Sequence, residues 1–313
     1  MNKVLSESNR RLYDKLTRDL GSVIVDALLN PDITEVMLNP DGGLWLESHE
    51  KGMYKVGSMS HVQATAIVNT VAGIHNVIVS RDSPHLEAEL PVYGAMKGQR
   101  LTAQVPPVVV SPSFTIRKRA EKIYNLDEYV NAGLLEPAQI SLIRELILSR
   151  ANMLVCGSPS SGKTTFTNAI LAEISNLTPE HRIALLEDLP ELQCHAPNVL
   201  AMLTSQSSPM VRLIRTCVRS RIDRIFIGEV RGGEVLDMLK AWNTGCPGGV
   251  CTTHANGIEE AIQRVVDLSM EAGLVNPPHS LVNHTIDAVI WVVRKDNQKG
   301  FVQDIQLKGE KWI

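Results

Sequence analysis

The sequence has few aromatic residues, and this scarcity limits the ligands it can bind by stacking. Of its 313 residues, 4% are Phe, Trp or Tyr, whereas proteins that hold single nucleic-acid strands usually stack the bases on such side chains. An excess of positive charge is also missing, since 31 Lys and Arg face 34 Asp and Glu for a formal net charge of -3. The few aromatics argue against a base-stacking platform for single strands. The balanced charge argues against nucleic-acid binding through the overall field, while a local basic stripe stays open.

The sequence also lacks the features of a secreted or membrane-spanning protein. Its five cysteines are odd in number and show no close pairing typical of disulfide scaffolds. No run approaches the roughly 20 apolar residues that span a bilayer, and the first residues offer no signal-peptide core. We therefore expect a cytoplasmic protein with reduced thiols, whose contact with a membrane, if it has one, is peripheral.

What is present is an ordinary globular composition, with 44% hydrophobic and 21% charged residues. A chain of this length allows two domains of roughly 100–200 residues each. Residues 1–120 mix helix-like and strand-like patterns, which predicts a small α+β domain. Its expected elements are helices at Arg10–Leu29 and His61–Ile74 and strands at Ile33–Leu38, Leu44–Glu47 and Ser113–Lys118.

A different rhythm occupies the rest of the chain. The pattern weakens over 121–136, which we interpret as a linker, and over 137–313 apolar strand-like runs alternate with helix-like runs. This alternation predicts an α/β domain with a mostly parallel sheet. Its expected strands are Asn152–Cys156, Ile183–Glu187, Arg224–Ile227, Gly249–Thr253 and two near Ile286–Val293 and Gly300–Leu307, and its expected helices include Lys163–Ile174 and Pro209–Ser220.

The strongest motif is GSPSSGKT at Gly157–Thr164, which satisfies the pattern G-x-x-x-x-G-K-[ST]. It lies between a predicted strand and a predicted helix, where backbone N–H groups can surround phosphate oxygens at a helix N-terminus. Lys163 would reach the β- and γ-phosphates of ATP, and the Thr164 hydroxyl would bind Mg²⁺, a hard ion that prefers oxygen ligands. We assign nucleotide binding to Gly157, Ser158, Pro159, Ser160, Ser161, Gly162, Lys163, Thr164 and Thr165.

Acidic residues follow two of the predicted strands. Glu229 ends one of them, in the position of a Walker B acid, while Glu187 and Asp188 end another. Such sheets hold ligands at the carboxyl ends of their strands, and phosphoryl transfer needs one carboxylate for the metal and a group that orients water. We predict Lys163, Glu187 and Glu229 as catalytic and Thr164, Glu229 and Asp188 as Mg²⁺ ligands. Taken alone, each acid also fits a solvated residue at a strand end.

A histidine and a row of arginines complete the candidate set. His254 follows the strand Gly249–Thr253, where it could bond a terminal phosphate and act in catalysis. Arg212, Arg215 and Arg219 recur at i, i+3 and i+7, on one face of a predicted helix. Such a face is usually solvated, but Arg215 and Arg219 are candidates for an arginine finger at a subunit interface.

In order and spacing, these motifs resemble those of the PilT/GspE superfamily of secretion ATPases, and in particular the TrbB-like conjugal-transfer ATPases of type IV secretion. The chain has a Walker A motif at Gly157–Thr164, an Asp box at Leu186–Glu191, a Walker B motif at Ile225–Glu234 and a His box at Thr253–Asn256. It lacks the paired-cysteine zinc motif of many GspE-like ATPases and the retraction-type C-terminal signature of PilT. Both absences favour the conjugation branch.

The resemblance implies a RecA-like P-loop NTPase domain, joined by a mobile linker to a smaller N-terminal α+β domain and assembled into a ring, typically a hexamer. It implies that Glu229 helps to hold Mg²⁺, that His254 senses phosphate, and that Glu187 is the candidate general base, with the choice between Glu187 and Glu229 open. Arg100 and Arg117 would reach the nucleotide from the N-terminal domain; strand-edge charges paired with acids are the alternative.

The implied function is ATP hydrolysis coupled to domain motion that powers pilus assembly or substrate translocation in conjugative type IV secretion. The implied partners are other copies of the chain and the inner-membrane and coupling components of the apparatus, at the cytoplasmic face of the inner membrane. Three other functions stay open: a P-loop kinase, for which no acceptor motif is visible, a RecA-like DNA motor, and a non-catalytic scaffold that binds nucleotide. The sequence leaves the ring size and the transported substrate open.

Overall fold

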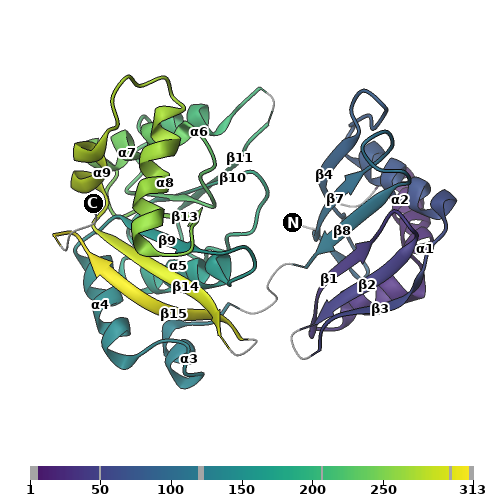
Figure 1. Cartoon of the computed structure of the whole chain (residues 1–313), viewed down its shortest axis with the longest axis horizontal. Helices are drawn as coiled ribbons and strands as arrows, with labels where there is room; N and C mark the ends of the chain where they lie inside the picture. The colour runs from purple at the N-terminus through teal and green to yellow at the C-terminus, as the bar shows by residue number, and fades with distance from the viewer. Residues whose placement is uncertain (1–5, 49–50, 119–122, 206, 296–297, 310–313) are drawn as a thin grey trace. The chain divides into compact units, whose positions relative to one another are not determined.

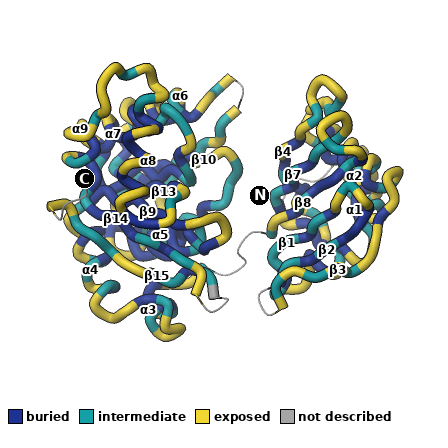
Figure 2. Tube along the Cα trace, viewed as in Figure 1, coloured by how far each residue is buried: buried dark blue, intermediate teal, exposed yellow. Residues whose placement is uncertain are grey.

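The computed structural model describes residues 6–48, 51–118, 123–205, 207–295 and 298–309. The chain divides into two compact units, Met1–Glu121 and Lys122–Ile313, shown in Figure 1. Buried residues gather inside each unit (Figure 2), so each has a hydrophobic core of its own. Within the described residues, no helix has the length and apolarity needed to cross a bilayer.

The first unit is an antiparallel sheet with two helices packed on it. The sheet order is β3-β2-β1-β8-β7-β4. Helix α1 buries Leu16 and Leu20, which lie four residues apart on one face, and the helix then kinks at Gly21, whose φ is 76°. Ile24, beyond the kink, is also buried. The elements are α1 (Glu7–Leu29), β1 (Ile33–Leu38), β2 (Gly43–Ser48), β3 (Gly52–Ser58), α2 (His61–Ile74), β4 (His85–Glu89), β5 (Val92–Tyr93), β6 (Met96–Lys97), β7 (Arg100–Gln104) and β8 (Ser113–Arg117).

The second unit contains a seven-stranded sheet in the order β11-β10-β12-β13-β9-β14-β15. Every neighbouring pair is parallel except the hairpin of β14 and β15. The strands are β9 (Met153–Gly157), β10 (Ile183–Glu187), β11 (Val199–Leu203), β12 (Arg224–Ile227), β13 (Val250–His254), β14 (Ala288–Lys295) and β15 (Gln298–Leu307). The helices are α3 (Leu126–Asn131), α4 (Pro137–Leu148), α5 (Lys163–Leu177), α6 (Met210–Cys217), α7 (Glu234–Thr244), α8 (Ile258–Met270) and α9 (His279–Thr285).

Helices cover both faces of this sheet (Figure 1). Alternate residues of β9 enter different cores: Leu154 and Cys156 pack with residues of α6 to α9, whereas Met153 and Val155 pack with residues of α3 to α5. Because both faces are covered, β9 and β10 are buried along their whole length, as the continuous apolar runs predict. The strands therefore deliver their carboxyl ends, and the loops that follow them, to one edge of the unit.

The linker predicted over 121–136 contains a helix. Residues 121 and 122 lie outside the described residues, but α3 occupies Leu126–Asn131 and begins at a capping box between Asn125 and Glu128. Leu126 and Tyr129 are buried in the core with α4 and α5. The linker prediction is wrong over this stretch, because a six-residue helix is too short to show a clear helical period.

Candidate active site

The sequence Gly157–Thr164 has the strand–loop–helix form that its motif predicts. Strand β9 ends at Gly157, and α5 begins at Lys163 after Gly162, which adopts a left-handed backbone with φ +99°. A Cβ at Gly157 would lie 2.1 Å from the carbonyl oxygen of Val292, so only glycine fits there. The loop is thus closely packed, and its chain direction turns sharply into the N-terminus of α5.

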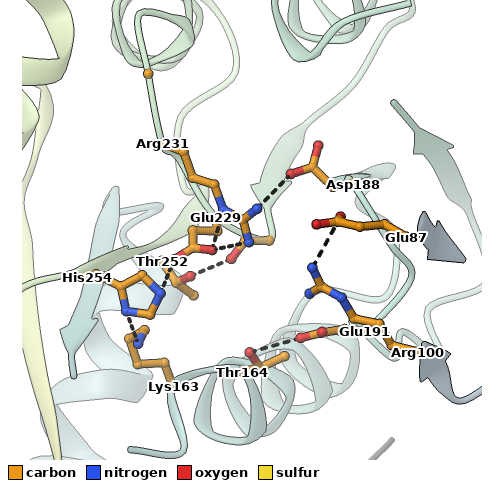
Figure 3. A network of polar contacts seen from close by, with 12 residues as sticks. Glu87, Arg100, Lys163, Thr164, Asp188, Glu191, Glu229, Arg231, Thr252 and His254 are labelled. Atoms are coloured by element: carbon orange, nitrogen blue, oxygen red, sulfur yellow. Dashed lines mark hydrogen bonds and ion pairs between the residues drawn. The ribbon is translucent and has the colours of Figure 1, made fainter. Parts of the chain in front are cut away.

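The side chain of Lys163 lies under this loop and is 7% exposed. Its Nζ donates to the backbone oxygens of Gly157 and Ser158, each at 2.9 Å, and lies 3.0 Å from Nδ1 of His254 (Figure 3). An ammonium group only donates hydrogen bonds, so Nδ1 accepts and the ring proton is assigned to Nε2. The structure therefore brings two predicted catalytic residues, one from the loop and one from the end of β13, into direct contact.

Glu229 extends this contact on the other side of the ring. Its Oε1 lies 2.6 Å from Nε2 of His254, and its Oε2 accepts from Nε of Arg231 at 2.7 Å. Arg231 also reaches Oδ2 of Asp188 at 3.6 Å, and Asp188 Oδ1 accepts from the hydroxyl of Thr204 at 2.8 Å. A chain of polar contacts across four strand ends thus joins Lys163, His254, Glu229, Arg231 and Asp188 (Figure 3).

The environment keeps His254 neutral. Burial lowers its pKa from the ordinary value of 6.5, and the nearby Lys163 ammonium lowers it further, while Glu229 opposes the change. A neutral ring is also what the contact with Lys163 requires, since a protonated Nδ1 could not accept. Arg231 was not singled out from the sequence; its position two residues beyond Glu229 is the signal that could have found it.

Glu187, predicted as catalytic, holds a loop. Its Oε1 accepts the backbone N–H groups of Glu191 and Leu192, both at 2.8 Å, and the residue is buried. Asn168 of α5 assists, because its side chain accepts from the backbone N–H of Gln193 at 2.9 Å and donates to the backbone oxygen of Glu191 at 3.2 Å. These two buried side chains fix the turn that carries Glu191.

The residues predicted to bind Mg²⁺ are only partly brought together. The hydroxyl of Thr164 donates to Oε2 of Glu191 at 3.5 Å, whereas Asp188 and Glu229 are linked to each other through Arg231. In the described part of the chain, no three His, Cys, Asp or Glu side chains gather into an all-protein metal site. Mg²⁺ usually binds one or two protein oxygens together with substrate phosphates, and the Thr164 and Glu191 oxygens fit that donor set.

The arginines of the predicted helical face do not all lie in one helix. Arg215 lies in α6 and forms a double contact with Asp237 of α7, Nε to Oδ1 at 2.8 Å and Nη2 to Oδ2 at 3.3 Å. Helix α6 ends at Cys217, three residues earlier than predicted, so the exposed Arg219 lies beyond it. The backbone also changes direction shortly after this helix, at Arg221, which has a left-handed φ of 55°.

Arg100 and Arg117 of the first unit lie opposite each other on β7 and β8. Each has an acidic partner in its own unit: Arg100 Nη2 lies 3.4 Å from Oε2 of Glu87, and Arg117 Nε donates to Oε1 of Glu35 at 2.7 Å. Two arginines in directly opposite positions of a ladder repel each other, and the flanking acids offset that repulsion. The pairs correspond to the alternative reading of these residues as strand charges with acidic partners.

Several known proteins are similar to this chain. The family described as Type II/IV secretion system protein matches residues 18–309. A conjugal transfer protein TrbB of Sinorhizobium fredii is 41% identical over 92% of this chain and 87% of its own length, and TrbB of Rhizobium radiobacter is 38% identical over 96% and 92%. The crystal structure of the pilus retraction motor PilT with bound ADP superposes with a TM-score of 0.62 at 16% identity, covering 86% of this chain and 76% of that one. The chain therefore has a RecA-like P-loop fold, as that structure does.

Proposed function

Because the chain belongs to the type II/IV secretion system protein family, and within it to the TrbB conjugal transfer proteins, we propose that it hydrolyses ATP to power conjugative type IV secretion. The observation that carries this proposal is the line of contacts from Lys163 through His254 to Glu229. A cation, a neutral imidazole and a carboxylate at adjoining strand ends can bind a phosphate, sense it and act on a water molecule.

In this proposal the loop N–H groups and Lys163 bind the phosphates of ATP. The phosphates replace Gly157 O, Ser158 O and His254 as partners of the Lys163 ammonium, so His254 loses its donor when nucleotide binds. Glu229 orients and deprotonates the attacking water, and Arg231 and His254 hold its carboxylate in place. Bound Mg²⁺ would be held by Thr164 and Glu191 and would supply positive charge to the phosphate oxygens.

We assign the general base to Glu229 and a positioning role to Glu187. This choice is supported by the surroundings of the two carboxylates: Glu229 contacts His254 and Arg231, whereas Glu187 Oε1 accepts two backbone N–H groups. The backbone donors of Glu187 belong to the folded turn and stay in place, whereas the side-chain partners of Glu229 can move away when nucleotide and water enter. Glu187 then serves the reaction by fixing the turn that presents Glu191.

We further propose that the protein acts as a homo-oligomeric ring, a hexamer, in which Arg219 of one copy approaches the nucleotide of the next. Arg219 is preferred to Arg215 because Arg215 already binds Asp237 in its own chain. Arg100 and Arg117 are proposed to contact nucleotide after exchanging their acidic partners. The ring would work at the cytoplasmic face of the inner membrane, as a peripheral component beside the inner-membrane and coupling proteins of the apparatus.

The direct test is ATP turnover by the purified protein. We expect Lys163→Ala to abolish measurable hydrolysis and to weaken nucleotide binding, and the exposed lysine variant Lys240→Ala to behave like the wild type. Wild-type turnover in Lys163→Ala would refute the assigned site. Imaging the protein with a non-hydrolysable ATP analogue tests the ring, and a strictly monomeric protein at micromolar concentration with the analogue bound would overturn it.

A further inference from the structure

The backbone of β15 lies directly against the phosphate-binding loop. The N–H of Gly300 donates to the backbone oxygen of Ser161 at 2.7 Å. A Cβ at Gly162 would lie 2.6 Å from the nitrogen of Gly300, so the two chains approach as closely as glycine allows. Gly300 itself has a φ of +92°, a conformation that other residues adopt only with strain. Two glycines therefore let the C-terminal hairpin fix one wall of the loop.

The other side of Gly300 faces an aromatic ring. A Cβ at Gly300 would lie 3.2 Å from Cε1 and 3.3 Å from the hydroxyl oxygen of Tyr129. Tyr129 is 3% exposed and packs edge to face on Phe166 of α5, with ring centroids 5.3 Å apart. The segment after α3 is tied to the same strand, because the N–H of Val302 donates to the oxygen of Leu134 at 2.8 Å.

These contacts form a circuit, a closed series of packed residues. The loop at Ser161 contacts Gly300, Gly300 packs against Tyr129, and Tyr129 packs on Phe166. Phe166 lies one turn after Lys163 in α5, so the series returns to the end of the loop. Every link is buried, so displacing one member displaces the next. The circuit holds the loop oxygen of Ser161 on one side and the first turn of α5 on the other, and so constrains the N–H groups between them.

We propose that Gly300 and Tyr129 are positioning residues for nucleotide binding, which hold the phosphate-binding loop in the form that accepts phosphate. Neither residue touches the reacting atoms; both act through Ser161 and the start of α5. The inference rests on the proposed function only in that the loop binds nucleotide. The proposal thus gives β15 and α3, which lie outside the loop motif, a role in nucleotide binding.

The test is Gly300→Ala, with Gly273→Ala as the matched control. Gly273 also has a positive φ, +85°, but a Cβ there would meet nothing within 4 Å, so its variant reports backbone strain without the contact. We expect Gly300→Ala to weaken ADP binding about tenfold and to raise the KM for ATP, with kcat within about twofold. The expected loss is below the roughly 10²-fold cost of a 1 Å misplacement, because relieving the contact with Tyr129 requires a smaller shift. Gly273→Ala should bind ADP like the wild type, and thermal unfolding should show both variants folded.

A second variant tests the contact itself. If the added methyl group acts through the ring, Gly300→Ala combined with Tyr129→Leu should lose less ADP affinity than the two single changes predict together. Equal ADP binding by Gly300→Ala and the wild type, equal losses in both glycine variants, or additive losses in the double variant would each overturn the inference. These outcomes leave the proposed function standing, whereas failure of the wild type to bind ADP would remove both.

Discussion

The two ends of the seven-stranded sheet both carry charged side chains, but they use them differently. At the carboxyl ends of the strands, the side chains of His254 and Arg231 are 48% and 53% exposed and contact carboxylates. At the amino end of β12, Arg224 is 0% exposed. Its guanidinium donates to Nδ1 of His181 at 2.9 Å and to the backbone oxygens of Gly248 at 3.0 Å and Ile147 at 2.8 Å.

The partners explain the difference. The backbone oxygens that Arg224 binds are held by the folded chain, so its guanidinium stays in place. Burial lowers the pKa of Arg224 to about 10, and the side chain keeps its charge at neutral pH. Side-chain partners can be exchanged, so the charges around Glu229 can release one another when a phosphate arrives. A buried arginine with backbone partners thus has a structural role. Half-exposed side chains of opposite charge, whose partners can change, are typical of a binding site.

The largest effect should come from the carboxyl ends. Glu229→Gln keeps the shape of the side chain but removes its basicity, and we expect turnover to fall about 10³-fold, the size of a lost general base. Glu187→Gln is the matched control, since its amide oxygen can still accept the two backbone N–H groups, and it should keep most of the activity. A collapse of turnover in Glu187→Gln with activity retained in Glu229→Gln would reverse our assignment of the base.

At the amino end, the loss should appear in stability. Arg224→Met fills a similar volume but leaves two buried backbone oxygens and the half-buried His181 without their donor. We expect it to lower the free energy of unfolding by about 3 kcal/mol. Denaturant unfolding measures this, with the exposed Arg212→Met as control. Nucleotide affinity in the folded fraction should be unchanged. Weakened nucleotide binding without a loss of stability would break the proposed contrast between the two ends.

The next largest effect should be a pH dependence of stability at the amino end of the sheet. Burial lowers the pKa of His181 from 6.5, and the Arg224 and Arg150 charges lower it further. The folded protein therefore binds a proton more weakly than the unfolded chain, so stability is full above about pH 6.5 and falls as the pH drops below it. His181→Gln should flatten this fall in unfolding experiments between pH 7 and 5. An unchanged slope would contradict a neutral, half-buried His181.

The smallest effect should come from the surface. Arg215→Ala removes an exposed pair with Asp237, and exposed ion pairs contribute little to stability. We expect no measurable change in the unfolding midpoint and little change in turnover, whereas Arg219→Ala should lower turnover of the assembled ring. The turnover of the two variants is compared at the same protein concentration, chosen high enough for the ring to assemble. Loss of turnover in Arg215→Ala alone would transfer the interface role to Arg215.

Much of the fold could be predicted because its strongest signals are local. The strands Ile33–Leu38, Ile183–Glu187 and Arg224–Ile227 and the helix His61–Ile74 have the predicted bounds. Strand β11 and helix α3 lacked such a signal, because β11 is half exposed along its length and α3 is too short for a helical period.

The site was only partly predictable for a different reason. The loop and His254 follow from sequence motifs, but the role of Glu187 depends on where the next turn folds back, and that depends on Asn168 in another helix. The burial of Arg224 likewise depends on oxygens far away in sequence, at Ile147 and Gly248. A sequence pattern gives the type of residue at a strand end, whereas its partner is fixed only by the packed chain.

The contact between Lys163 and His254 also turns the imidazole into a natural spectroscopic probe. Because Nδ1 accepts from the ammonium, the ring is held as a single tautomer with its proton on Nε2. The ¹⁵N resonances of an accepting and a protonated ring nitrogen are widely separated, so removal of the ammonium by a phosphate would shift the Nδ1 signal. Nuclear magnetic resonance of this one side chain could then follow nucleotide binding and release at the loop, with no label on the nucleotide.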